Sequence, residues 1–235
     1  MRALLLAAGL GTRLRPITYR VPKCLLPVRG KPLLAYWLDL LLDAGIEQVL
    51  VNTHYLPEVV REFVSLSPWR ARITLVHEDR LLGTGGTILR NRDFLESGAF
   101  LVAHADNLTR FDVSAFLERH RTRPAGFEIT MMTFDTDAPQ TCGIVEEDAR
   151  GVVIAFHEKV RNPPGTRANA AVYIFEQILI DFLGSLGKEM IDLSTEVIPH
   201  FLGRICTFHN SDYHRDIGTP ESLRKVEAEF SSHPQ

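Results

Sequence analysis

The sequence predicts an α/β fold built on a doubly wound, mostly parallel sheet. Short apolar runs alternate with segments of helical spacing through the first 135 residues, as expected for strands joined by covering helices. The first apolar run, Leu4–Ala8, passes directly into glycines, which is typical of a buried strand before a tight turn. With 235 residues, of which 45% are hydrophobic and 23% charged, the chain has a globular composition and enough length for a sizeable core.

The first half supplies most of the predicted sheet. Leucines and Trp37 at helical spacing predict a helix over Leu33–Asp43 that ends before Gly45, and a proline at the first turn favours a second helix over Pro57–Val64. The further elements predicted here are the strands Gln48–Asn52, Ile73–His77, Phe100–Ala103 and Ile129–Phe134, and the helices Gly86–Arg92 and Val113–His120.

After Asp135 the pattern changes. Gly143–Glu147 and Val152–His157 are predicted to pair as a hairpin around the turn at Arg150–Gly151. Since no long linker or repeat interrupts the chain, we expect one domain over residues 1–235 with two halves, 1–135 and 136–235. The later elements predicted are the strands Ala170–Phe175 and Ile205–Phe208, and the helices Glu176–Leu183, Leu193–Leu202 and Pro220–Phe230.

The charges are unevenly distributed. The whole chain has a net charge of −3, yet seven cations precede the first acid, Asp39. Cations gathered around one glycine-rich loop suit a small polyanion such as a nucleoside triphosphate. The alternative is a solvated basic face without a ligand. The seven cations are Arg2, Arg13, Arg15, Arg20, Lys23, Arg29 and Lys31.

The loop after the first strand, Gly9–Arg13, lets backbone N–H groups approach phosphate oxygens because its glycines carry no Cβ. It is not a dinucleotide fingerprint, since Leu14 stands where the third glycine belongs and Asn52 where the ribose-binding acid belongs. It is not a P-loop either, because no Gly-Lys-Ser/Thr follows. A purely structural turn would need the glycines but not the neighbouring arginines and lysine.

Bulk properties exclude other classes. The chain has no long apolar run or signal peptide, so we expect a cytoplasmic protein that does not contact membranes. Its three cysteines, Cys24, Cys142 and Cys206, are widely spaced and are expected to be reduced thiols. The sequence pI near 6.3 argues against a nucleic-acid partner.

The loop carries a family resemblance. Residues 6–16, Leu-Ala-Ala-Gly-Leu-Gly-Thr-Arg-Leu-Arg-Pro, followed by Pro22–Lys23, resemble the start of the sugar-1-phosphate nucleotidyltransferases. Shorter matches follow in the family's order at residues 82–86, 105–106, 142–145, 158–159, 169–173 and 216–220. The resemblance implies a Rossmann-like α/β fold with a small acceptor-binding β lobe, and an enzyme that joins an NTP to a sugar 1-phosphate and releases pyrophosphate.

The same resemblance implies roles for individual residues. Arg13 and Lys23 would neutralise the phosphates of the two substrates, and Asp106 and Asp216 would hold a Mg²⁺ ion. Arg15 and Arg20 could contribute to the same neutralisation or could be rim charges. The implied nucleotide-binding residues are Ala8, Gly9, Gly11, Thr12, Gly83, Thr84 and Gly85, where glycines leave room for a flat base. The implied sugar-phosphate-binding residues are Gly143, Glu158, Lys159 and Asn169, with Glu196 as a further candidate.

Two features of the sequence leave alternatives for these residue roles. His104-Ala105-Asp106 replaces the family's usual Asn-Gly-Asp, which changes the contacts that the ribose or sugar could make there. Asp106 and Asp216 could instead be helix caps or turn residues, as isolated aspartates often are. Asp112 is interpreted as such a cap, and His209 and His214 as packing residues.

The length and the Leu-Gly-Thr-Gly-Gly loop most resemble guanylyltransferases that act on heptose or mannose 1-phosphate. The D-glycero-D-manno-heptose 1-phosphate branch, which serves bacterial capsule and surface polysaccharide synthesis, is the first choice. A uridylyltransferase for glucose 1-phosphate or N-acetylmuramic acid 1-phosphate stays open, as does a non-catalytic regulator that binds nucleotide sugars. No appended β-helix is expected. The resemblance also brings a homodimer as an expectation.

Overall fold

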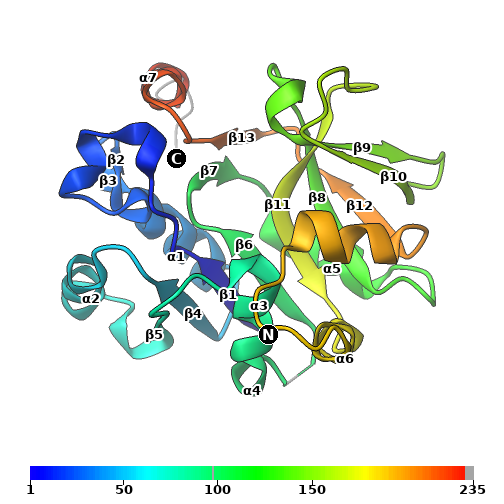
Figure 1. Ribbon diagram of the computed structural model, residues 1–235, viewed down its shortest axis with the longest axis horizontal. Helices are drawn as coiled ribbons and strands as arrows, with labels where there is room; N and C mark the ends of the chain where they lie inside the picture. Colours follow the sequence, from blue (N-terminus) through cyan, green and yellow to red (C-terminus); the bar gives the residue numbers. More distant parts are fainter. Residues whose placement is uncertain (97, 231–235) are drawn as a thin grey trace. The chain divides into compact units, whose positions relative to one another are not determined.

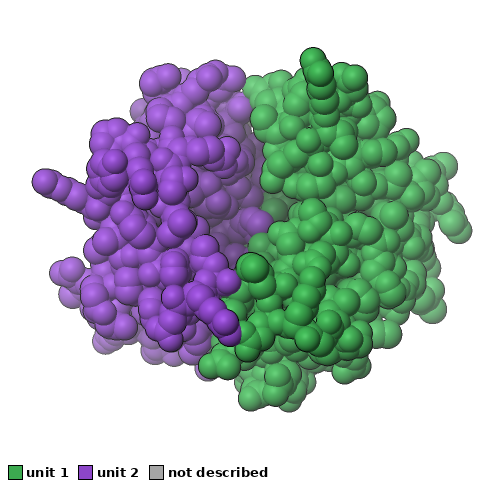
Figure 2. Space-filling view, viewed as in Figure 1, with its two compact units in different colours: residues 1–2, 82–103, 111–212 green, residues 3–81, 104–110, 213–235 purple. Residues whose placement is uncertain are grey.

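The computed structural model describes residues 1–96 and 98–230. The chain divides into two compact units, each built from segments that are distant in sequence (Figure 2). Unit 1 comprises residues 1–2, 82–103 and 111–212, and unit 2 comprises residues 3–81, 104–110 and 213–235. Within the described residues, no helix combines the length and the apolar character that crossing a membrane requires.

Unit 2 contains the first strands of the chain (Figure 1). β1 (Arg2–Leu6), β4 (Gln48–Thr53) and β5 (Ile73–His77) lie in that order, and β4 and β5 are parallel. Apolar side chains at helical spacing bury one face of α1 (Leu33–Asp43), including the fully enclosed Trp37. The helix α2 (Pro57–Leu66) packs on β5.

Two antiparallel ribbons and the last helix complete unit 2. β2 (Pro27–Val28) pairs with β3 (Lys31–Pro32), and β7 (Asn107–Arg110) pairs with β13 (Tyr213–Asp216). The helix α7 (Pro220–Glu229) begins with a capping box between Thr219 and Ser222.

Unit 1 is organised around the long strand β11 (Arg167–Phe175). β11 is antiparallel to β6 (Phe100–His104), β8 (Ile129–Asp135) and β9 (Gly143–Glu147). β9 forms a hairpin with β10 (Val153–Glu158), and β12 (Ile205–His209) runs parallel to β8. The helices are α3 (Gly83–Arg90), α4 (Arg92–Leu95), α5 (Val113–Arg121) and α6 (Ile178–Ser185).

The predicted α/β class is confirmed, and α1, β5 and β9 have the predicted bounds. The helix predicted over Leu193–Leu202 is present but is not an α-helix. Residues 193–202 form a π-turn (Leu193–Val197) followed by a 3₁₀ turn (Ile198–Phe201). Pro199 lies in the middle of this segment, and its missing N–H removes one α-helical hydrogen bond.

A buried histidine links the stability of unit 1 to pH. His120 is 3% exposed, and its Nδ1 lies 2.7 Å from the Thr130 hydroxyl. Burial, and then the Arg123 guanidinium, lower the pKa of His120 to about 4, although Glu176 opposes this shift. The folded protein therefore holds a neutral imidazole at pH values where the unfolded chain, with an ordinary pKa near 6.5, is protonated.

We expect this histidine to make the folded state less stable as the pH falls from 6.5 to 5, at a slope of about 1.4 kcal/mol per pH unit where only the unfolded chain is protonated. Urea unfolding of the wild type and of His120→Gln across this range measures the slope, which should decrease in the variant. His200→Gln, at an exposed position, is the control and should keep the wild-type slope. An unchanged slope in His120→Gln would contradict the prediction.

Candidate functional site

The glycine loop of unit 2 is built by specific contacts at each end. Where β1 ends, the Ala7 amide donates to the side-chain oxygen of Asn52 (2.7 Å), which is 2% exposed. Gly11 has a φ of 62°, and a Cβ there would lie 2.9 Å from a methyl carbon of Thr18. The Thr18 hydroxyl in turn donates to the Gly11 carbonyl (2.8 Å). The positive φ and the close contact with Thr18 therefore require a glycine at position 11. The Asn52 side chain holds the backbone at Ala7, just before the loop begins.

Lys23 brings both predicted metal-binding aspartates to one point. Its Nζ donates to Oδ2 of Asp106 (2.6 Å) and to Oδ1 of Asp216 (3.2 Å), and the lysine is only 6% exposed. The two carboxylates are separated by 110 residues in sequence but are bound to the same nitrogen atom. Neither aspartate caps a helix: Asp106 lies in the turn directly before β7, as the alternative of a turn residue predicted, and Asp216 ends β13.

The β7–β13 ribbon explains how these aspartates meet. Its register pairs Asp216 with Asn107, and the Ile217 amide donates to the Asp106 carbonyl (3.3 Å). The Ala105 amide donates to the Leu6 carbonyl at the end of β1 (3.0 Å), which places Asp106 beside the glycine loop.

Apolar neighbours anchor each segment of the site. Leu14, Leu108 and Ile217 belong to one buried cluster of unit 2, and each is within two residues of Arg13, Asp106 or Asp216. The Trp37 indole of α1 also donates to the Asn107 carbonyl (2.9 Å). The charged groups are thus held by burial of the residues next to them.

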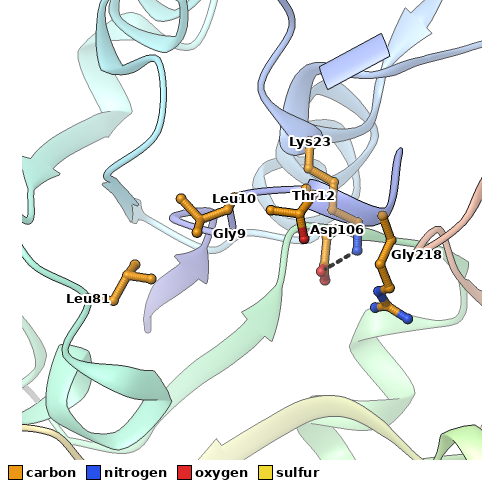
Figure 3. Close-up of a pocket in the computed structure, with 9 residues that line it drawn as sticks. Gly9, Leu10, Thr12, Lys23, Leu81, Asp106 and Gly218 are labelled. Carbon is orange, nitrogen blue, oxygen red and sulfur yellow. Dashed lines mark hydrogen bonds and ion pairs between the residues drawn. The ribbon is translucent and has the colours of Figure 1, made fainter. Parts of the chain in front are cut away.

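A pocket of about 320 Å³ opens onto these groups (Figure 3). Leu10 and Leu81, about 40% exposed, lie on the side away from the Lys23–Asp106 pair, so the pocket has an apolar end and a charged end. Of the predicted nucleotide-binding residues in unit 2, Ala8 is buried and does not line the pocket. The lining residues are Gly9, Leu10, Gly11, Thr12, Arg13, Lys23, Leu81, Asp106 and Gly218.

The ionisation of the central pair is set by burial and by mutual attraction. Burial alone would lower the pKa of Lys23, but the Asp106 and Asp216 carboxylates outweigh it and the net pKa is raised. Burial alone would raise the pKa of Asp106, but the Lys23 ammonium, and then His104, lower it below its ordinary value. The pair therefore stays charged throughout the neutral range. Burial raises the pKa of the adjacent Cys24 to about 12, so this thiol is protonated and is no nucleophile.

Because Gly218 has no side chain, the charged ends of Asp216 and Arg13 can both lie close to its backbone. A Cβ at this position would lie 2.7 Å from Oδ2 of Asp216 and 2.9 Å from Nη2 of Arg13. The guanidinium of the exposed Arg13 and the carboxylate of Asp216 therefore both lie close to Gly218. Arg15 instead lies over the Tyr19 ring at 5.3 Å and is exposed, as expected for a rim charge.

The histidines near the site are placed by the same ribbon. His214 lies on β13, where burial is the main cause that lowers its pKa to about 3, opposed by the Asp106 carboxylate and reinforced by His104. A neutral His214 fits its interpretation as a packing residue. The predicted cap is also present: the side chain of Asp112 accepts from the Ala115 amide (2.9 Å).

The predicted base-binding glycines lie in unit 1 and have a packing reason of their own. A Cβ at Gly83 would lie 2.4 Å from the Ile191 carbonyl oxygen, and one at Gly85 would lie 2.8 Å from the Ile191 side chain. The Gly85 amide already donates to the Ile191 carbonyl (2.9 Å), and the Thr84 hydroxyl accepts from the Leu193 amide (2.7 Å). These contacts explain why glycine is needed at positions 83 and 85, and the binding of a base beside this loop stays a prediction.

Gly86→Ala is expected to destabilise the protein by about 1–3 kcal/mol, as overpacking of a core does. A Cβ there would lie 2.1 Å from the Glu189 carbonyl oxygen, which is backbone and cannot move alone. Gly184→Ala in α6 is the matched control, because nothing lies within 4 Å of its added Cβ and alanine favours helices. Chemical denaturation compares the two variants, and equal stability would refute the packing explanation.

The predicted sugar-phosphate residues lie on neighbouring strands of unit 1. Gly143 pairs with Glu158 across the β9–β10 hairpin, and a Cβ at Gly143 would lie 2.7 Å from a carboxylate oxygen of Glu158. Lys159 forms an ion pair with Glu158 (2.9 Å). Asn169 donates to the Tyr173 hydroxyl (2.5 Å) and accepts from the Ala171 amide (2.9 Å), where β11 bulges.

Tyr173 and Asp192 lie near this group and were not among the site residues predicted from the sequence. The Tyr173 hydroxyl lies close enough to Glu158 and Asp192 for both carboxylates to help burial raise the pKa of Tyr173. The carboxylate of Glu196, a further candidate for sugar binding, accepts from the Asp192 amide (2.9 Å) and forms an ion pair with Lys188, and its role towards a sugar stays a prediction. The sequence offered one clue to Tyr173, because this residue ends the segment 169–173 that already resembled the family.

Two curated relatives match over most of the chain. Mannose-1-phosphate guanylyltransferase of Mycobacterium tuberculosis is 35% identical over 233 residues, which cover 97% of this chain. UTP--glucose-1-phosphate uridylyltransferase of Synechocystis sp. is 31% identical over 229 residues, which cover 91% of this chain. The chain spans only 64% and 58% of the lengths of these relatives.

Solved structures match the fold along its whole length. A protein from Bacillus anthracis assigned as a glucose-1-phosphate thymidylyltransferase, in complex with sucrose, has a TM-score of 0.89 at 21% identity and covers 100% of this chain and 97% of its own. HddC from Yersinia pseudotuberculosis, complexed with GMP-PN, has a TM-score of 0.81 at 25% identity and covers 97% of this chain and 99% of its own.

The family profile described as nucleotidyl transferase matches residues 2–233. Together with the glycine loop and the carboxylates that share Lys23, this match identifies the chain as a member of the nucleotidyl transferase family.

Proposed function

We propose that this protein is a sugar-1-phosphate nucleotidyltransferase that converts an NTP and a sugar 1-phosphate into an NDP-sugar and pyrophosphate, with residues 1–235 acting as one catalytic domain. The observation that carries the proposal is the contact of one buried lysine with two carboxylates beside a glycine loop. A pocket lined by backbone, by Lys23 and by Arg13 suits a polyphosphate.

The chemistry requires little beyond charge and alignment. The second pKa of a phosphate monoester is about 6, so the attacking oxygen of a sugar phosphate is already anionic at neutral pH. No general base is needed, which agrees with the protonated state of Cys24. Arg13 and Lys23 would reduce the repulsion between the two phosphates and hold them in line.

The residues present fit a Mg²⁺ ion. Magnesium in phosphate-transfer sites is held by one or two carboxylates together with substrate phosphates and water, and its charge would stabilise the leaving pyrophosphate. Asp106 and Asp216 supply two such carboxylates, and both reach the position of a single cation, which Lys23 occupies. Within the part of the chain that the structure describes, no group of three or more His, Cys, Asp or Glu could hold a metal by itself, so phosphate oxygens would complete the shell.

We favour GTP as the nucleotide and mannose 1-phosphate or D-glycero-D-manno-heptose 1-phosphate as the acceptor. Two similar proteins support guanine as the base. The relative that is 35% identical is a mannose-1-phosphate guanylyltransferase, and the structure of HddC contains GMP-PN. The uridylyltransferase that is 31% identical keeps UTP with glucose 1-phosphate as the second candidate. Gly143, Glu158, Lys159 and Asn169 are the residues proposed to bind the acceptor.

The test is a matrix of four NTPs against several sugar 1-phosphates with Mg²⁺, with pyrophosphate release as the readout. We expect turnover with GTP and a mannose- or heptose-type acceptor. Turnover only with UTP would support the second candidate. A blank matrix combined with tight binding of a nucleotide sugar would overturn the enzymatic proposal in favour of a regulatory, non-catalytic protein.

A further inference from the structure

The ammonium of Lys23 occupies the position that a metal ion would take between Asp106 and Asp216. It binds one oxygen of each carboxylate, at 2.6 and 3.2 Å, and its side chain is 7% exposed. The carboxylates themselves are open to solvent, with side-chain exposures of 31% and 51%. An ion arriving from solvent would therefore reach the carboxylates but would find a cation already bound between them.

A second cationic side chain lies near the Asp216 carboxylate. Oδ2 of Asp216 and Nη2 of Arg13 lie 2.7 and 2.9 Å from the position that a Cβ on Gly218 would take, so the Arg13 guanidinium is in the neighbourhood of this carboxylate. A divalent ion placed on these carboxylates would lie within a few ångströms of both cations, where like charges repel strongly in a partly buried site. The carboxylates are thus neutralised internally in the resting protein.

The chain allows the Lys23 ammonium to move while its backbone stays fixed. The 3₁₀ turn Lys23–Leu25 is closed by the Leu25 amide, which donates to the Pro22 carbonyl (2.8 Å), and Cys24 and Leu25 beside it are buried. Lysine carries its charge on a flexible four-carbon stem, so rotations of the side chain can redirect it. Lys23 also lines the pocket with Gly9, Gly11 and Thr12, where the phosphates of a nucleotide would offer it another anion.

We propose that Lys23 is an exchangeable counter-ion: it blocks the metal site in the free protein, and nucleotide phosphates draw it away so that metal and nucleotide bind as linked events. This inference rests on the metal role of Asp106 and Asp216 in the proposed function. By reciprocity, each ligand tightens the other, and the free protein binds divalent metal weakly.

The test measures binding of Mn²⁺ alone to the free protein by electron paramagnetic resonance, without any turnover. Lys23→Met should bind Mn²⁺ at least about 10-fold more tightly than the wild type, a coupling of ordinary size. Lys23→Arg keeps a cation in place and should bind as weakly as the wild type. Lys23→Met combined with Asp106→Asn should lose the gained affinity, which assigns it to these carboxylates.

Folding is followed by thermal unfolding of each variant with and without Mn²⁺, and a larger stabilisation of Lys23→Met by the metal would support the exchange independently. Equal or weaker Mn²⁺ binding by folded Lys23→Met would overturn the inference even if the wild type releases pyrophosphate. Conversely, tighter Mn²⁺ binding by Lys23→Met together with a blank substrate matrix would uphold the exchange and reject the proposed enzymatic function.

Discussion

Asp106→Asn is expected to lower the rate of pyrophosphate release by at least about 100-fold, the loss typical of removing one preorganised charge contact from an active site. Asparagine keeps the size of the side chain but removes its charge, so the site loses half of its carboxylate pair and Lys23 keeps only Asp216. The measurement is steady-state turnover with the best substrate pair from the matrix, at saturating Mg²⁺.

Asp112→Asn is the matched control for this loss. Asp112 caps α5 on the exposed surface, and asparagine caps helices about as well as aspartate does. Its turnover and stability should therefore equal those of the wild type. Because removing one partner of a buried ion pair also destabilises proteins, urea unfolding must show that Asp106→Asn is folded under the assay conditions. Near-wild-type turnover by folded Asp106→Asn would reject Asp106 as a metal ligand.

Gly218→Ala should reduce turnover by about 10- to 100-fold while the protein stays folded, since displacement of catalytic groups by about 1 Å can have effects of this size. The added Cβ would press on the ends of the Asp216 and Arg13 side chains, which can swing aside without moving backbone. Loss of activity should thus exceed loss of stability.

Kinetic assay and thermal unfolding of the same Gly218→Ala sample test this separation. Gly165→Ala is the control, because nothing lies within 4 Å of a Cβ at that position. Full activity in Gly218→Ala would mean that the position of Asp216 and Arg13 beside this glycine is unimportant. Unfolding of the variant would mean that the glycine serves the fold instead.

The sequence predicted the parts of the fold that local patterns encode. The apolar spacing in α1 and the glycine that follows it defined this helix to the residue, because burial of one helical face is written in the order of the side chains. The cluster of cations around the glycine loop likewise identified Lys23 and Arg13 as neighbours of one pocket.

Contacts between distant segments could not be predicted in this way. The β7–β13 ribbon joins residues 107–110 to 213–216, and neither strand has the apolar alternation that marks a buried strand. The glycines of α3 were predicted from the sequence only as room for a base, and their second role, close packing against residues 189–191, is visible only in the structure. In both cases the contacting segment lies about 100 residues away in the sequence. The spacing of side chains within one segment contains no information about such a contact.

Unit 2 is built from three separate segments of the chain, so it cannot form completely until the third segment has been synthesised. A nascent polypeptide that has reached Asp212 already contains the glycine loop, Lys23 and Asp106, but β7 still lacks its pairing strand and the lysine has a single acidic partner. The contact of Lys23 with both carboxylates can therefore form only after residues 213–216 have emerged from the ribosome, and translation products that stop before them should lack it.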